Sequence, residues 1–155
     1  NASNIETASL AHPGFAKLID NLSPDEAIFL QTLRKIVTIP FIEIRLNTGN
    51  NTWNSLEDFV VSESITSGLT FKNNFPAYIS NLDSLGIIKI RRDIWITPIE
   101  KHYIPIWEAK RAAYGPLEKS LAGANMTLGY EKARADITPF GKLFISACFT
   151  NVENT

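Results

Sequence analysis

The segment from Phe75 to Pro98 constrains the fold more than any other part of this chain, because it signals a helix, a helix stop and two strands in succession. The apolar residues of its first half recur at steps of three and four, which places them on one face of an α-helix. They are Phe75, Tyr78, Ile79, Leu82 and Leu85. Gly86 follows directly, and glycine takes the left-handed conformation at a helix end without steric cost. We therefore predict a short helix that ends at Gly86.

The remainder of this segment has the pattern of a two-stranded hairpin. A three-residue loop at 91–93 pairs Ile90 with Ile94 and places four isoleucines on one face. A two-residue loop mixes apolar and charged residues on each face, so we prefer the longer loop. Thr97 and Pro98 then match the cap and the first position of a following helix.

A helix and a strand are signalled upstream of this segment. Ser23 to Glu26 combine an N-cap serine, a proline at the first helical position and a capping-box glutamate. Residues 41–47 alternate between apolar and polar side chains, which is typical of a half-buried strand. The chain therefore enters the central segment through one helix and one strand.

A second helix is predicted between that strand and the central segment. Residues 48–51 form a turn signal, and Leu56, Phe59 and Val60 then recur at helical spacing, with Gly68 as the stop. The resulting order is helix, strand, helix, helix and two-stranded hairpin. This is the order of a winged helix, so the predicted fold class is α+β with a winged-helix-like core.

The chain after Pro98 predicts a C-terminal extension of broken helix, β-ribbon and helix. Pro105 and the pair Gly115-Pro116 interrupt a helical pattern, and residues 127–137 read as an extended edge strand or exposed ribbon. Thr138 and Pro139 then match the start of a last helix. Its apolar stripe consists of Phe140, Leu143, Phe144, Ala147 and Cys148.

The length of 155 residues predicts a single domain, which we place at residues 10–149. Residues 1–9 are expected to be a tag-cleavage scar followed by a disordered segment, and residues 150–155 a polar tail. Because the chain begins without methionine, we expect it to be a fragment of a longer protein.

Charge and cysteine content limit the classes of protein to which the chain can belong. Fifteen basic and sixteen acidic residues give a net charge of -1, which argues against a strongly basic nucleic-acid module. One cysteine excludes an intramolecular disulfide and fits a reducing compartment. No apolar run approaches the roughly 18 residues of a membrane span. We therefore expect a cytoplasmic protein.

Several local phrases resemble the Abi-alpha family, which consists of sparsely characterised bacterial proteins linked to abortive phage infection. These phrases are His12-Pro13 with Phe15, LSPDEA at 22–27, Asn81-Leu82 with LGII at 85–88, and TPFGKLFISAC at 138–148. The chain departs from the family pattern at Gly14, at Ala16 and in the proline-interrupted region 98–123. The resemblance implies a bacterial role in phage defence, in the cytoplasm or near the membrane, and it carries over no catalytic residue.

The predicted hairpin offers one candidate contact surface. Lys89, Arg91 and Arg92 are basic, and Trp95 lies nearby, so the group fits contact with a partner or with phosphates. The same residues also fit a solvated hairpin with a packed Trp95. The preceding helix has no outward Arg or Lys, and Asp83 on it would repel phosphate.

The broken helix offers a second candidate surface. Tyr103, Trp107 and Tyr114 are aromatic residues at near-helical spacing, and they fit either a self-association surface or the core. Because winged helices often dimerise through added helices, we retain a homodimer contact here as a hypothesis.

No catalytic, cofactor or metal site can be assembled from the remaining residues. The groups considered are His12, His102, Cys148, Asp25-Glu26 and Glu57-Asp58. The histidines lack metal-ligand spacing, the cysteine lies on an apolar helical face, and the paired acids fall in first turns of predicted helices. We therefore expect a non-enzymatic domain, without cofactor or small-molecule substrate, that binds a protein partner or itself. The alternative is a winged-helix transcriptional regulator that binds DNA through the basic hairpin.

Overall fold

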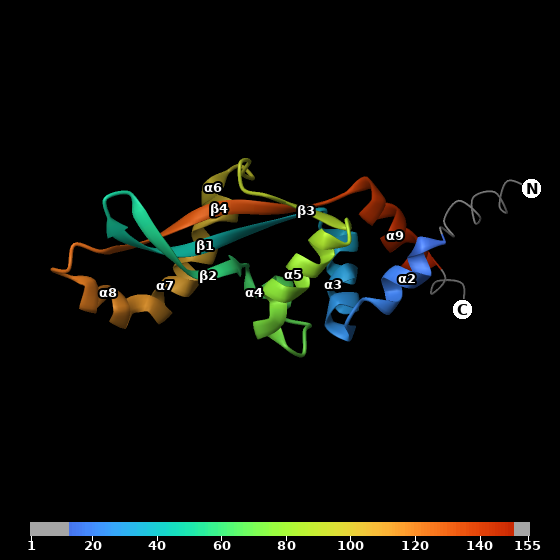
Figure 1. Cartoon of the computed structure of the whole chain (residues 1–155), viewed down its shortest axis with the longest axis horizontal. Helices are drawn as coiled ribbons and strands as arrows, with labels where there is room; N and C mark the ends of the chain where they lie inside the picture. Colours follow the sequence, from blue (N-terminus) through green and yellow to red (C-terminus); the bar gives the residue numbers. More distant parts are fainter. Residues whose placement is uncertain (1–12, 151–155) are drawn as a thin grey trace, which may run out of the picture. The chain divides into compact units, whose positions relative to one another are not determined.

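Four strands and a series of short helices make up residues 13–150, the part of the chain that the computed structural model describes (Figure 1). The predicted α+β class is confirmed, because the strands form one antiparallel sheet in the order β2-β1-β4-β3. The elements are α2 (Gly14–Asp20), α3 (Pro24–Lys35), β1 (Thr38–Gly49), β2 (Thr52–Val60), α4 (Glu63–Thr66), η1 (Lys72–Asn74), α5 (Phe75–Ser84), β3 (Ile88–Arg91), α6 (Ile99–His102), α7 (Ile104–Arg111), η2 (Ala112–Tyr114), α8 (Gly115–Leu121), β4 (Thr127–Ile137) and α9 (Pro139–Thr150).

The described residues divide into two compact units. Unit 1 contains the described residues up to Thr38, those from Ser67 to Lys89 and those from Asp136 onward. Unit 2 contains Ile39–Thr66 and Ile90–Ala135. The single domain at 10–149 stays a prediction. The predicted scar at 1–9 lies outside the described residues, as does the predicted tail apart from Thr150, the last residue of α9.

The start of α3 in unit 1 confirms the predicted capping box. The Ser23 hydroxyl accepts a hydrogen bond from the Glu26 amide at 3.2 Å, and the Glu26 carboxylate accepts one from the Ser23 amide at 2.6 Å. The same helix buries the apolar residues Phe29, Leu30 and Leu33. Helix α3 lies beside both α5 and α9 (Figure 1).

The end of α5 confirms the predicted glycine stop. Gly86 has a φ of 78°, its amide donates to the Asp83 carbonyl, and the Ile87 amide donates to the Leu82 carbonyl, both at 3.0 Å. These two bonds satisfy carbonyl groups that the helix would otherwise leave open, as in a Schellman motif. The chain then enters β3 directly.

Hydrogen bonds connect the start of α9 to the residues that follow α5. Thr138 caps α9 as predicted, because its hydroxyl accepts from the Gly141 amide at 2.9 Å. The same hydroxyl donates to the Gly86 carbonyl at 2.5 Å, and the Thr138 amide donates to the Ile87 carbonyl at 3.0 Å. The two phrases at 85–88 and 138–148 are therefore in direct contact within unit 1.

The apolar stripe of α9 is buried only in part. Phe144 and Ile145 are buried, whereas Leu143 is 52% exposed. The inward face runs through Gly141, Phe144, Ile145 and Cys148, because a close backbone approach at Gly141 fixes which side of the helix faces the unit. The predicted inward position of Leu143 is wrong.

Asp25 connects α3 to the segment before α5. Its buried carboxylate accepts hydrogen bonds from the Thr70 amide at 2.9 Å, the Phe71 amide at 2.7 Å and the Tyr78 hydroxyl at 2.9 Å. The two backbone bonds are the largest cause that holds the pKa of Asp25 below its ordinary value of 3.8. Asp25 is therefore a tertiary anchor as well as a residue of the first helical turn.

The predicted helix between 55 and 68 is wrong up to Val60, because the chain forms β2 there, and only the short α4 is helical in the remainder. Asn50 and Asn51 have φ values of 53° and 60°, so the predicted turn exists and connects β1 to β2 as a tight hairpin. The helical spacing of the apolar residues has a different origin. Asp58 and Phe59 together face the single residue Glu43, a β-bulge that adds one residue and breaks the alternation of the strand.

The predicted hairpin at 88–97 is also absent, so the structure does not show the predicted winged-helix arrangement. Strand β3 ends at Arg91, and it pairs with β4 rather than with residues 94–96. The Ile96 amide donates to the Tyr103 hydroxyl at 2.9 Å, so a side chain satisfies a group that a strand partner would otherwise bind. Pro98 is the N-cap of α6 rather than its first helical residue.

The C-terminal extension follows the prediction with one change. The helix is broken into α6, α7 and α8, with Pro105 and Pro116 in the first turns of the last two. Residues 127–137 are extended as predicted, but β4 is a central strand rather than an edge. No helix in the described part of the chain is long and apolar enough to cross a bilayer.

The core of unit 2 lies between the sheet and these helices. Its fully buried members are Ile42, Ile44, Val60, Tyr103 and Ile106. Half-buried side chains pack around them, namely Ile96, Ile99, Trp107, Tyr114 and Tyr130. The broken helix therefore faces the sheet with its aromatic residues.

Substitution of Gly141 by alanine should destabilise the chain by about 3 kcal/mol, because a Cβ there would lie 2.0 Å from the Ile87 carbonyl oxygen. Gly115→Ala is the matched control, since nothing lies within 4 Å of its added Cβ, and it should change stability by less than about 1 kcal/mol. Chemical denaturation of both variants measures the difference. Equal stability of the two variants would contradict the close approach of Gly141 to the Ile87 carbonyl oxygen.

Substitution of Asp25 by asparagine should lower stability in a pH-dependent way. A depressed carboxyl pKa stabilises the folded state above the unfolded value, and this contribution is lost as the pH falls through the folded value. The difference in Tm between wild type and Asp25→Asn should therefore be constant at neutral pH and shrink below about pH 3.8. Thermal unfolding across pH measures it, and a difference that persists unchanged into acid would refute the assignment.

Candidate interaction surface

Both arginines of the predicted hairpin are paired with carboxylates. Arg91 pairs with Asp93 at 3.3 Å, and Arg92 pairs with Asp58 at 2.8 Å. Lys89 is exposed on the part of β3 that belongs to unit 1. The arginines are therefore already matched by carboxylates within unit 2.

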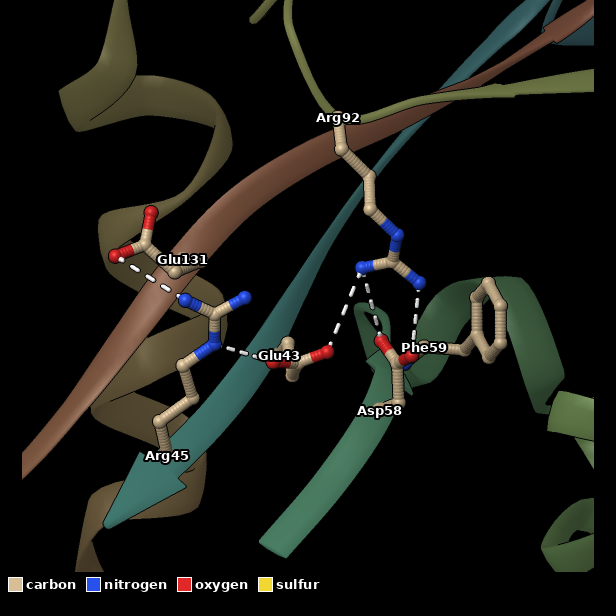
Figure 2. Close-up of polar contacts among 6 residues, drawn as sticks. All are labelled: Glu43, Arg45, Asp58, Phe59, Arg92 and Glu131. Atoms are coloured by element: carbon tan, nitrogen blue, oxygen red, sulfur yellow. Dashed lines mark hydrogen bonds and ion pairs between the residues drawn. The ribbon is translucent and has the colours of Figure 1, made fainter. Parts of the chain in front are cut away.

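A cluster of alternating charges surrounds Glu43 in unit 2. Figure 2 shows the Glu43 carboxylate between two guanidinium groups: Arg45 hydrogen-bonds to one oxygen, and Arg92 lies 3.6 Å from the other. Arg45 also lies 3.8 Å from Glu131, and Arg92 reaches Asp58. We call these five residues the charge cluster. Three carboxyl groups and two guanidinium groups give it a formal charge of -1.

The β-bulge of β2 is part of this cluster. Phe59 has a φ of 53°, an uncommon conformation for a bulky residue, and its amide donates to the Asp58 carboxylate at 2.8 Å. The Arg92 guanidinium lies 5.3 Å from the ring centroids of both Phe41 and Phe59. Arg92 thus binds the acidic and aromatic groups of the bulge together, which accounts for its place in the fold without any ligand.

Two tryptophans in unit 2 are exposed and lie against cations. Trp53 is 47% exposed, with the Arg45 guanidinium 3.6 Å from its ring centroid. Trp95 is 45% exposed, with the Lys132 ammonium 4.4 Å from its ring centroid. A cation is attracted to an indole face, which favours the observed orientation of each exposed ring.

Trp95 and Trp107, which the sequence placed on separate candidate surfaces, are joined by β4. The Lys132 ammonium also lies 5.8 Å from the Tyr130 ring, and Tyr130 lies 5.1 Å from Trp107. We call Trp95, Lys132, Tyr130 and Trp107 the aromatic strip. Tyr130 and Lys132 were not predicted as site residues, although their spacing of two residues places both on one face of the predicted ribbon.

Tyr103 is buried and holds this arrangement from within. Its hydroxyl accepts from the Ile96 amide at 2.9 Å and donates to the Ala133 carbonyl at 3.0 Å. Ile96 follows Trp95, and Ala133 follows Lys132. The hydroxyl therefore fixes the two backbones that carry the exposed end of the aromatic strip. Because Tyr103 itself is fully buried, it offers no exposed surface for self-association in this fold.

Tyr114 is half-buried beside Glu57 rather than in the aromatic strip. Its hydroxyl donates to the Glu57 carboxylate at 2.8 Å, and Lys110 lies 2.7 Å from the same carboxylate. Burial, followed by the contact with Glu57, raises the pKa of Tyr114 to about 12. The phenol is therefore a hydrogen-bond donor at neutral pH.

The remaining candidate groups, Cys148 and His102, lie on different helices, α9 and α6. Burial raises the pKa of the Cys148 thiol, which makes it a poorer nucleophile at neutral pH. His102 lies at the end of α6, and His12 lies outside the described residues. No group of three or more His, Cys, Asp or Glu side chains in the described ranges is arranged to hold a metal ion.

Removal of the Glu43 charge should destabilise the chain more than removal of the Glu131 charge, although both contact Arg45. The Glu43 side chain is 8% exposed and that of Glu131 is 56% exposed. We expect Glu43→Gln to cost about 2 kcal/mol, because two guanidinium groups lose a buried partner, and Glu131→Gln less than about 0.5 kcal/mol. Urea denaturation measures both, and equal costs would show that Glu43 does not organise the cluster.

Comparisons with known proteins place the chain in a family. A family described as "Abortive infection alpha" matches residues 1–148. Among curated proteins, none matches this chain. A solved structure of an uncharacterised protein from the hydrocarbon-degrading marine bacterium Alcanivorax borkumensis SK2 is similar, with a TM-score of 0.50 and 16% sequence identity over 92% of this chain and 94% of that chain. This likeness concerns the fold alone. The family match, which spans nearly the whole sequence, shows that the chain belongs to the Abi-alpha family.

Proposed function

We propose that this Abi-alpha domain is a non-enzymatic interaction module that binds a protein partner through the aromatic strip. The observation that carries the proposal is that Trp95 is exposed to solvent and also contacts a cation. Its indole is 45% exposed, yet Lys132 lies 4.4 Å from its ring centroid. The family description names abortive infection, and we propose phage defence in the bacterial cytoplasm as the setting.

Aromatic residues that are exposed and already ordered are suited to binding. Trp and Tyr are enriched among the residues that dominate protein interfaces, because they bury a large area with few rotatable bonds. In the aromatic strip, Trp107 and Tyr130 are anchored on the core of unit 2, and Trp95 extends outward from them. Little conformational entropy remains to be lost when a partner covers Trp95.

The charges of unit 2 favour a protein over a nucleic acid as the partner. The unit contains nine acidic and nine basic residues, so it has no net attraction for a polyanion. Arg91 and Arg92 are paired with Asp93 and Asp58. The DNA-binding alternative would need these guanidinium groups to exchange carboxylates for phosphates.

Selection from a ribosome-display library of random peptides tests the proposal. Peptides that bind the wild-type chain should lose about 2 kcal/mol, or roughly 30-fold in affinity, on Trp95→Ala, as expected for a central aromatic contact. Trp53→Ala is the matched control, because Trp53 is equally exposed and also rests on a cation but lies outside the aromatic strip. Fluorescence polarisation gives the affinities.

Two outcomes would contradict the proposed function. Peptides that bind Trp95→Ala as tightly as wild type would place the interaction elsewhere. Binding of an oligothymidylate that is lost on Trp95→Ala and weakens steeply with salt would favour a nucleic acid instead. Light scattering in parallel shows whether the partner is a second copy of this chain.

A further inference from the structure

We propose that the partner segment bound by the aromatic strip carries an Asp or Glu whose carboxylate binds the Lys132 ammonium between Trp95 and Tyr130. This inference rests on the proposed function, because it names the chemistry of the partner at the same surface. Trp95, Tyr130 and Trp107 then contact apolar side chains that flank the acidic residue. The occupant is therefore a short peptide segment with one carboxylate among apolar residues.

The surroundings of Lys132 differ from those of the cations in unit 2 that are paired with carboxylates. Arg45, Arg92 and Lys110 each lie within ion-pair distance of a carboxylate. Lys132 makes no ion pair with any residue that the structure describes, and its ammonium lies against the faces of Trp95 and Tyr130 instead. Lys132 is thus a half-buried cation at the exposed end of the aromatic strip.

The chemistry of the ammonium group indicates what it can still bind. Lysine has three N–H donors and no acceptor. An aromatic face attracts the charge but is not a directional hydrogen-bond acceptor, whereas a carboxylate forms short, charge-assisted bonds with it. The two rings also exclude water from part of the group, which strengthens a contact with an added anion. A carboxylate therefore complements Lys132 better than a neutral polar group.

A phosphate could also bind an ammonium group, but the other features of the surface favour a peptide. Single-stranded nucleic acids bind where bases can stack on open ring faces in a positive groove. Lys132 lies over a face of both Trp95 and Tyr130, and unit 2 has no net positive charge. A carboxylate requires neither open ring faces nor a positive groove.

The test uses peptides selected on the full chain and compares each with its counterpart in which Asp or Glu is replaced by Asn or Gln. On the wild-type chain the acidic peptide should bind about tenfold more tightly than the amide peptide. On Lys132→Gln the two peptides should bind equally, and on Lys132→Arg the preference for the acidic peptide should return. Lys119→Gln removes an exposed lysine outside the aromatic strip and should retain the full preference.

The outcomes separate this inference from the proposed function. Peptides that depend on Trp95 but show no preference for the acidic form would overturn the carboxylate assignment and leave the interaction surface standing. An acidic preference that survives in Lys132→Gln would place the carboxylate on another cation and also overturn it. Failure of every peptide to depend on Trp95 would overturn the proposed function and this inference together. Thermal unfolding confirms that the variants are folded.

Discussion

The hydroxyl of Tyr103 is the contact on which the arrangement of the candidate surface depends. It bridges the Ile96 amide and the Ala133 carbonyl, two backbone groups from segments that do not pair as strands there. A buried amide without a partner is costly, so this bond both permits and fixes the irregular path of residues 92–97. Trp95 and Lys132 precede the two bonded residues, and their contact follows from the same bridge.

The charge cluster gives a parallel explanation for the other irregular feature of unit 2. The bulge at Asp58 and Phe59 places a carboxylate and a ring where Arg92 can contact both. Glu43 then receives Arg45 and Arg92 from two sides, and Arg45 supports Trp53 (Figure 2). Arg92, one of the two arginines of the predicted hairpin, is thus held within the charge cluster of this fold.

The sequence predicted the helix ends best, because their signals are local. The capping box at Ser23, the left-handed Gly86 and the Thr138 cap each depend on residues within one turn, and each is confirmed. The identity of β2 could not be read in the same way. Its bulge changes the spacing of Leu56, Phe59 and Val60 from that of a strand to that of a helix, and only the pairing with β1 reveals it. Trp95 and Trp107 were predicted on two separate surfaces. The contacts of Lys132 and Tyr130 that join them form only through tertiary packing, which the sequence pattern does not reveal.

The NMR chemical shift of the Lys132 ε-methylene protons tests most directly whether Lys132 lies against Trp95 and Tyr130. Ring currents from Trp95 and Tyr130 should move these protons well upfield of a free lysine in the wild-type chain. The shift should fall substantially in Tyr103→Phe, which removes the bridging hydroxyl, and persist in Trp53→Ala. A free-lysine value in the folded wild-type chain would contradict the aromatic strip, and an unchanged upfield shift in Tyr103→Phe would contradict the role assigned to the hydroxyl.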